Sequence, residues 1–75
     1  MLESIIAMFE TILERDSGTV KADDEFREYA EWDSLAYLSV IAKIDDDYEI
    51  VVPREAFQSI RTVKELADYI DNHKV

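Results

Sequence analysis

Hydrophobic residues recur near the start of the chain with the spacing of an amphipathic helix. Between residues 2 and 13 the apolar positions lie three and four residues apart, and most of the positions between them are polar. Such a stripe lets one face of a helix pack against a core while the other face stays in water. The stripe consists of Leu2, Ile5, Ile6, Phe9, Ile12 and Leu13. We expect the helix to stop at Asp16-Ser17-Gly18, where Gly18 can adopt a positive φ.

Residues 19–32 show no sustained period and carry many charges, which predicts a long connecting loop. Phe26, Tyr29 and Trp32 recur every three residues within it. This spacing is compatible with a short turn, but we expect the rings rather to fasten the loop to the core. Trp32 is expected to pack under the loop rather than lie exposed, because Trp is highly buried on average. A loop of this length in a small domain is uncommon and often functional.

A second helical pattern begins at Asp33, a residue type that caps helix N-termini well. It carries two adjacent apolar rows, which predicts a central helix packed on two sides. One row consists of Leu35, Leu38, Ile41 and Ala42, and the other of Tyr37, Val40, Ile44 and Tyr48. The pattern ends in Asp45-Asp46-Asp47-Tyr48-Glu49, where the helix dipole would favour cations over acids.

The rest of the chain predicts one short helix and one longer one. The run Ile50-Val51-Val52 leads to Pro53, which suits the first turn of a brief helix through Phe57. Thr62-Val63-Lys64-Glu65 is a capping box that begins the last helix. The buried stripe of that helix is Val63, Leu66, Ala67 and Ile70. The sum is an all-α fold, a small four-helix bundle that forms a single domain over residues 1–75.

Composition and charge argue against several classes of function. The 75 residues contain 18 Asp and Glu against 8 Lys and Arg, for a formal charge of −10. Binding to nucleic acid or to an anionic membrane needs clustered cations, so neither is expected. The absence of cysteine removes disulfides, thiolate metal sites and a Cys nucleophile, and the single histidine, His73, argues against a catalytic triad. Without a long apolar run or a leader pattern, we expect a cytoplasmic protein, and a monomer.

Ser34 has the chemistry of an attachment point. It lies one residue inside the predicted start of the second helix, where backbone N–H groups are unpaired and the helix dipole is positive. A phosphate ester on its hydroxyl would be stabilised there. Asp33 could cap the helix, or offer an oxygen to a divalent cation that also binds a pyrophosphate. Taken alone, the two residues are more typical of ordinary helix capping.

The surrounding sequence resembles a known family. Glu31-Trp32-Asp33-Ser34-Leu35 is similar to the phosphopantetheine attachment motif of acyl carrier proteins, and the likeness continues almost to the end of the chain. The helix closes on an acidic cluster with an aromatic residue, and a proline follows 19 positions after the serine. A short helix, a turn and a final helix come next, in the order of that family. Phe26 stands eight positions before the serine, where carrier proteins commonly have a core-facing Phe.

The resemblance implies a carrier and not an enzyme. A phosphopantetheinyl transferase would move 4′-phosphopantetheine from coenzyme A onto Ser34, with Asp33 and Leu35 completing the cofactor-binding motif. The thiol at the end of this arm would hold acyl groups as thioesters, and it would supply the sulfur that the chain lacks. The partners would be acyl-activating ligases, or synthase and transferase enzymes with basic docking faces.

The resemblance also places a partner-docking surface on the second helix. Its residues are Leu35, Ala36, Leu38, Asp45, Asp46, Asp47 and Glu49. Residues 22–49 hold ten acids and two cations, a net charge of −8 that would steer basic partners. The same charges equally suit a solvated surface. No metal centre is expected, because Ile50 and Ala56 occupy the glycine and final ligand positions of an EF-hand loop begun at Asp45; weak surface binding of divalent ions stays open.

Several positions depart from the pattern of fatty-acid carriers. Glu31 stands where many of them have glycine, Trp32 replaces a small residue, and Ala36 and Ser39 replace acids. This favours a specialised carrier, such as an aminoacyl, D-alanyl or peptidyl carrier, as the alternative to a carrier of fatty-acid synthesis; a closed core would favour it further. An unmodified acidic helical adaptor and a small hydrolase using Ser34 are further alternatives, and the hydrolase lacks an evident base.

Overall fold

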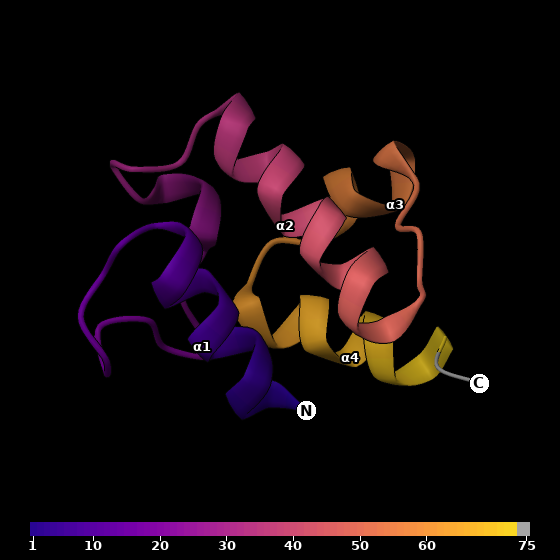
Figure 1. The fold of residues 1–75 in the computed structure, drawn as a ribbon, viewed down its shortest axis with the longest axis horizontal. Coiled ribbons are helices and arrows are strands. Elements are labelled where there is room, and N and C mark those ends of the chain that lie inside the picture. Colours follow the sequence, from indigo (N-terminus) through magenta and orange to yellow (C-terminus); the bar gives the residue numbers. More distant parts are fainter. Residues whose placement is uncertain (74–75) are drawn as a thin grey trace.

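The computed structural model describes residues 1–73 and consists of helices joined by irregular segments, in the order that the sequence predicts (Figure 1). The last two residues of the predicted domain, 74 and 75, lie outside the described residues. The helices are α1 (Leu2–Ile12), α2 (Ser34–Tyr48), α3 (Arg54–Ser59) and α4 (Val63–His73), with a single 3-10 turn at Phe26–Glu28. The predicted all-α, four-helix fold is confirmed.

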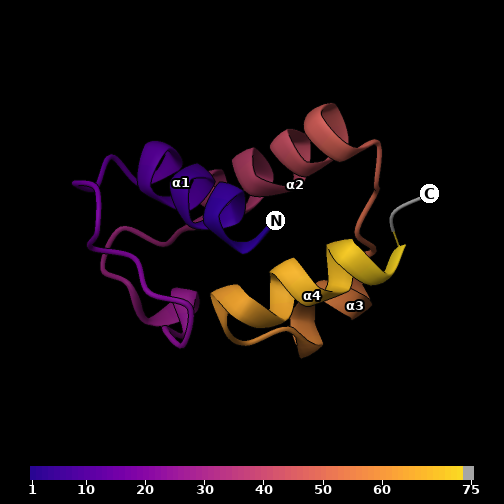
Figure 2. The same cartoon turned by 90° about the horizontal axis from the view of Figure 1, so that it is seen from below.

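The helices form two layers (Figure 2). Helices α1 and α2 lie side by side in one layer, and α3 and α4 form the other. Helix α1 packs against both α2 and α4, so it joins the layers. None of the helices in residues 1–73 is both long and apolar enough to cross a membrane.

The core lies between the layers and is filled by side chains from every helix and from the long loop. Its largest fully buried side chains are Phe9, Phe26, Phe57, Ile5, Ile44, Leu66 and Ile70. Each contributes about 1.5–3 kcal/mol by leaving water. The predicted stripe of α4 is buried at all four positions. Met8 is also buried, so it fills the core and does not lie on the surface.

Helix α1 ends earlier than the sequence predicts. Its last residue is Ile12, and Glu14 already adopts a positive φ of 55°. The reversal is closed by two backbone hydrogen bonds: the Glu14 N–H donates to the Thr11 carbonyl at 3.3 Å, and the Arg15 N–H donates to the Glu10 carbonyl at 2.8 Å. The Glu10 carboxylate orders the loop that follows, where it accepts hydrogen bonds from the N–H groups of Gly18 at 2.7 Å and Val20 at 3.3 Å. Gly18 does have the expected positive φ, 88°, but it serves the loop and not the end of the helix.

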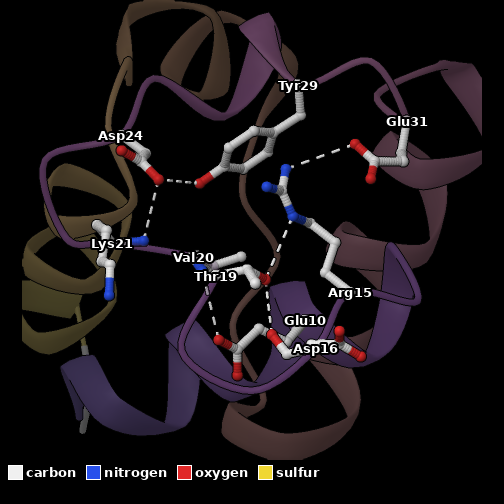
Figure 3. A network of polar contacts seen from close by, with 9 residues as sticks. All are labelled: Glu10, Arg15, Asp16, Thr19, Val20, Lys21, Asp24, Tyr29 and Glu31. Atoms are coloured by element: carbon white, nitrogen blue, oxygen red, sulfur yellow. Dashed lines mark hydrogen bonds and ion pairs between the residues drawn. The ribbon is translucent and has the colours of Figure 1, made fainter.

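The loop between α1 and α2 is anchored by aromatic and polar contacts, as expected. Phe26 is completely buried in the core. On the outer side, the Tyr29 hydroxyl donates to the Asp24 carboxylate at 2.6 Å, and the Arg15 guanidinium lies 4.2 Å from the centre of the Tyr29 ring (Figure 3). Arg15 also pairs with Glu31 at 3.5 Å. Two contacts therefore brace Tyr29 within the loop.

Helix α2 buries one face only, so the prediction of packing on two sides is wrong. Ala36, Val40 and Ile44 are buried, whereas Leu35 and Leu38 are 72% and 59% exposed. Within residues 1–73, nothing covers the two leucines of the second apolar row. The same row also includes half-buried Ile41 and exposed Ala42, whereas the other row supplies the buried residues Val40 and Ile44.

Helix α3 departs from its predicted bounds, whereas α4 begins where its capping box predicts. Pro53 is the residue before α3 and not its first turn, and α3 continues past Phe57 to Ser59. The capping box of α4 is confirmed: the Glu65 carboxylate accepts from the Thr62 N–H, and the Glu65 N–H donates to the Thr62 hydroxyl, both at 3.1 Å. Bonds from the N–H groups of Arg61 and Thr62 lower the pKa of the Glu65 carboxyl.

Candidate functional site

Ser34 is the first residue of α2, and its side chain is exposed where the long loop meets the helix. Asp33 is the N-cap, as predicted; its extended backbone lets one carboxylate oxygen accept the Ala36 N–H at 2.8 Å. The carbonyl of Asp33 accepts from the Tyr37 N–H at 3.0 Å and closes the first turn. The Ser34 hydroxyl therefore stands at the positive end of a capped, fifteen-residue helix.

An aromatic cluster packs on the core side of the junction between the long loop and α2. Trp32 is half-buried, and its ring lies 5.0 Å from Phe26 and 6.2 Å from both Phe9 and Phe57, measured between ring centroids. The expected packing of Trp32 is thus what the structure has. Tyr37, one turn into α2, meets Phe57 at 5.1 Å. These contacts hold the residues on both sides of Ser34 in place.

An open hollow of about 390 Å³ adjoins Ser34 on the side of α3; we name it the α3-side hollow. Its lining residues are Arg27, Trp32, Asp33, Ser34, Tyr37, Arg54, Phe57 and Gln58. Two guanidinium groups and one carboxylate give it a positive balance. Arg27, Arg54 and Gln58 were not predicted as neighbours of Ser34, because no local pattern shows that the 3-10 turn and α3 fold against the start of α2. Tyr37 lies three positions after Ser34 on the same helix, and the sequence pattern placed it only in an apolar row.

A second open hollow, of about 250 Å³, lies on the side of α1; we name it the α1-side hollow. Its lining residues are Ile12, Leu13, Glu14, Glu31, Asp33, Leu35, Ala36 and Ser39. Three of them are carboxylates and none is a cation. The start of α2 therefore separates a positive surface from a negative one.

The residues predicted to dock partners lie on the exposed side of α2, with one correction. Leu35 and Leu38 are exposed, as are the acids at 45–47 and 49. Ala36 is only 6% exposed and faces the core, so its side chain is not available to a partner. Val51, beyond the end of α2, is 70% exposed, whereas its neighbour Val52 is buried.

The other candidate chemistries find little support around Ser34. His73 lies in α4, stacks on Tyr69 at a centroid distance of 4.0 Å, and lines neither hollow. Within the described part of the chain, no group of three or more His, Cys, Asp or Glu side chains is placed to hold a metal ion. One aspartate at the end of α2 is paired instead, Asp47 with Lys43 at 3.4 Å.

Comparisons with known proteins agree with this geometry. The profile of the family described as "Phosphopantetheine attachment site" matches residues 3–70. The acyl carrier protein of Helicobacter hepaticus is 31% identical over 72 residues, covering 96% of this chain and 95% of that protein. The acyl carrier protein of Rubrobacter xylanophilus is 32% identical over 59 residues, covering 79% and 73%.

A solved structure shows the same fold. The solution NMR structure of holo acyl carrier protein from Geobacter metallireducens is similar with a TM-score of 0.80 at 24% identity, and the match covers 95% of this chain and 82% of that one. The matched profile spans the loop, α2 and α3 completely, all of α1 except its first residue, and α4 as far as residue 70. This chain therefore belongs to the acyl carrier protein family, the proteins that have a phosphopantetheine attachment site.

Proposed function

We propose that Ser34 carries a 4′-phosphopantetheine arm and that the protein transports acyl groups, held on that arm as thioesters, between partner enzymes. Members of the family are carriers rather than catalysts, and they act together with partner enzymes. The observation that carries the proposal is the exposed Ser34 hydroxyl at the capped N-terminus of α2, inside the segment that matches the family.

The residues around Ser34 fit this prosthetic group. A phosphodiester on the hydroxyl would be negatively charged, and the helix N-terminus and the arginines of the α3-side hollow favour an anion there. When bound, the group would supply a thiol at the end of a long arm, which a chain without cysteine cannot supply itself. The chain's own contribution is to present one hydroxyl in a fixed position.

Asp33 has a second use beside capping. One of its carboxylate oxygens accepts the Ala36 N–H, and a carboxylate has further acceptor capacity on its other oxygen. That oxygen could coordinate a divalent cation while a phosphopantetheinyl transferase holds coenzyme A against Ser34. Asp33 would then serve both the helix and the loading reaction.

The exposed side of α2 is the surface we assign to partner docking. Leu35 and Leu38 form its apolar part, close to the arm, and the acids at 45–47 and 49 form its charged part. Acyl-activating ligases, or synthase and transferase enzymes with basic faces, complement this arrangement. The charges would mainly raise the rate of encounter, and the leucines would supply the buried contact.

Mass spectrometry tests the proposal directly. After incubation with coenzyme A and a phosphopantetheinyl transferase of broad specificity, we expect the intact mass to increase by one phosphopantetheine. Ser34→Ala should abolish the gain, because no other hydroxyl is presented in the same way. Ser39→Ala, on the same helix, is the matched control and should load normally.

Two results would contradict the assignment: no gain in the unaltered protein, or a gain that persists in Ser34→Ala. A related result would favour an unmodified adaptor, namely that Ser34→Ala leaves the cellular function of the protein intact. Neither substitution should disturb the fold, because the side chains at 34 and 39 are not in the buried core.

A specialised aminoacyl or peptidyl carrier is the second candidate function, and two features favour it over fatty-acid transport. The first turn of α2 contains no acidic residue. The rings beside Ser34 also pack against one another, so aromatic side chains fill the space inside this end of the bundle. A carrier whose cargo stays outside the bundle has no need of that space.

A further inference from the structure

We propose that the α3-side hollow is a binding site for the near end of the arm: the Arg54 guanidinium pairs with the phosphodiester on Ser34, and the rings of Trp32 and Tyr37 pack against the apolar carbons that follow it. The inference rests on the proposed function, because it needs the arm on Ser34. It assigns this chain's own residues a part in directing the arm, which attachment alone would not require.

Covalent geometry decides which part of the arm meets the hollow. Ser34 forms part of its wall, and the phosphorus atom would be bonded directly to the serine oxygen. The phosphodiester would therefore stay at the mouth of the hollow whatever the rest of the arm does. The recognition group in this hollow must suit an anion, and a guanidinium suits a phosphate well.

Of the two arginines in the hollow, Arg54 is the one that can make the pair. The Arg27 guanidinium donates to the carbonyls of Ile60 and of Phe57, the latter at 2.6 Å, and lies between the rings of Phe26 and Phe57. Its position is therefore fixed, and it adds only its charge.

Arg54, by contrast, is exposed at the first position of α3. Its guanidinium lies over the Tyr37 ring, 5.7 Å from the centroid, and forms no ion pair with any residue between 1 and 73. Tyr37 is one turn along α2 from Ser34, so the Arg54 guanidinium lies near the residue to which the phosphate would be attached.

The aromatic part of the hollow matches the next atoms of the arm. In phosphopantetheine, a carbon bearing two methyl groups follows the phosphate and its methylene. Trp32 and Tyr37 are both half-buried and line the hollow beside Ser34, so each presents part of its ring to the space into which these carbons would extend. Burying the two methyl groups against these rings would remove apolar surface from water.

The α1-side hollow is the less favourable of the two hollows for the arm, because its charged lining residues are acids. A phosphodiester directed toward it would meet Glu14 and Glu31, without a cation among the lining residues, whereas Asp33 borders both hollows. Glu31 is paired with Arg15 at 3.5 Å, so Glu14 is the unpaired acid of the two within residues 1–73. The negative phosphodiester and these carboxylates would repel each other. The arm should therefore extend from Ser34 toward α3, which leaves Leu35 accessible to a partner enzyme.

The test compares the holo protein with holo Arg54→Gln by NMR, with Arg61→Gln as the control. Arg61 is exposed, loses the same charge on substitution, and does not line the hollow. Intact mass first establishes that each protein is loaded. We then expect nuclear Overhauser contacts from the two methyl groups of the arm to the Trp32 and Tyr37 rings. Arg54→Gln should weaken them by roughly two- to fivefold, the scale of a single exposed ion pair, and Arg61→Gln should not.

The outcomes separate the two proposals. If the unaltered protein does not load, the proposed function fails and this inference fails with it. If it loads but the methyl contacts are absent, or lie at Ile12 and Leu35, the arm does not use the α3-side hollow and the inference alone is overturned. Contacts that persist unchanged in Arg54→Gln would overturn the role of Arg54.

Discussion

Leu38 and Ile44 lie on the same helix but have opposite environments. Leu38 is 59% exposed, whereas Ile44 is completely buried between the layers. We expect Ile44→Ala to lower the free energy of unfolding by about 2–5 kcal/mol, because it leaves a cavity in the core. Leu38→Ala should change it by less than about 0.5 kcal/mol. Urea denaturation of the three proteins measures both values, and equal losses would show that Leu38 is packed.

The same pair of residues shows what periodicity can and cannot predict. The apolar rows of α2 are adjacent, and both have helical spacing, so the pattern alone cannot say which one faces the core. Tertiary packing decides, and it buries the row with Val40 and Ile44. The exposed leucine row is a local departure from hydrophobic burial, which is expected at a surface reserved for function. Ser34 was predictable because its neighbours carry a motif, and Arg54 was not, because only folding brings it near.

At the scale of elements, helix starts were predictable and the end of α1 was not. Asp33 and the Thr62–Glu65 box act through bonds within three residues, which a sequence displays directly. The stop at Ile12 is made by backbone bonds from the N–H groups of residues 14 and 15 to the carbonyls of residues 11 and 10. It places Glu14 at a positive φ, a conformation that residues other than glycine rarely adopt. Nothing in the order of residues shows that the chain will reverse there.

The loop between α1 and α2 should respond to acid through Asp24. The Tyr29 hydroxyl, followed by the N–H of Lys21 and the charge of Arg15, lowers the pKa of the Asp24 carboxyl, although partial burial opposes this. Burial and the neighbouring Asp24 in turn raise the pKa of Tyr29. Because the folded state favours ionised Asp24, the unfolded state binds the proton more readily. This stabilisation is present above the ordinary Asp value of about 3.9 and is lost as the pH falls through the lower, folded value.

Comparison of unfolding at about pH 7 and about pH 3 measures this contribution. The unaltered protein should lose more stability on acidification than Asp24→Asn does, by less than about 1 kcal/mol since the pair is near the surface. Asp23→Asn is the control, because Asp23 takes no part in the network of Figure 3. If Asp24→Asn and Asp23→Asn reduce the acid sensitivity equally, the Tyr29 hydrogen bond has no special role.

At the scale of the whole molecule, charge divides the surface into an acidic region and a positively charged hollow. Of the net charge of −10, residues 22–49 contribute −8, and these residues form the loop, α2 and the Glu49 that follows it. The positive exception is the α3-side hollow beside Ser34. An acidic exterior with one cationic hollow at the attachment point would steer basic enzymes toward α2 and hold an anionic arm on the opposite side of Ser34.

The packing beneath Ser34 bears on where a cargo resides. Phe26, Trp32 and Phe57 are mutually in contact, with centroid distances of 5.0–6.2 Å, and Phe9 and Tyr37 extend the cluster. Each such pair is worth about 0.5–1.5 kcal/mol beyond the area it buries, so separating several rings to admit a chain would use much of the stability of a domain this small. A cargo that remains outside avoids that cost.

We therefore expect an eight-carbon acyl group on the arm to leave the core unchanged. In NMR spectra of the acetyl- and octanoyl-loaded proteins, the methyl resonances of Val40 and Ile44 and the ring resonances of Phe57 should coincide, because the longer chain finds no space between the layers. Resonances of exposed Leu35 and Leu38 provide the control for contact outside the bundle. Core resonances that shift as the acyl chain lengthens would show that the aromatic cluster opens, and fatty-acid transport would then replace the specialised carrier as the better account of this chain.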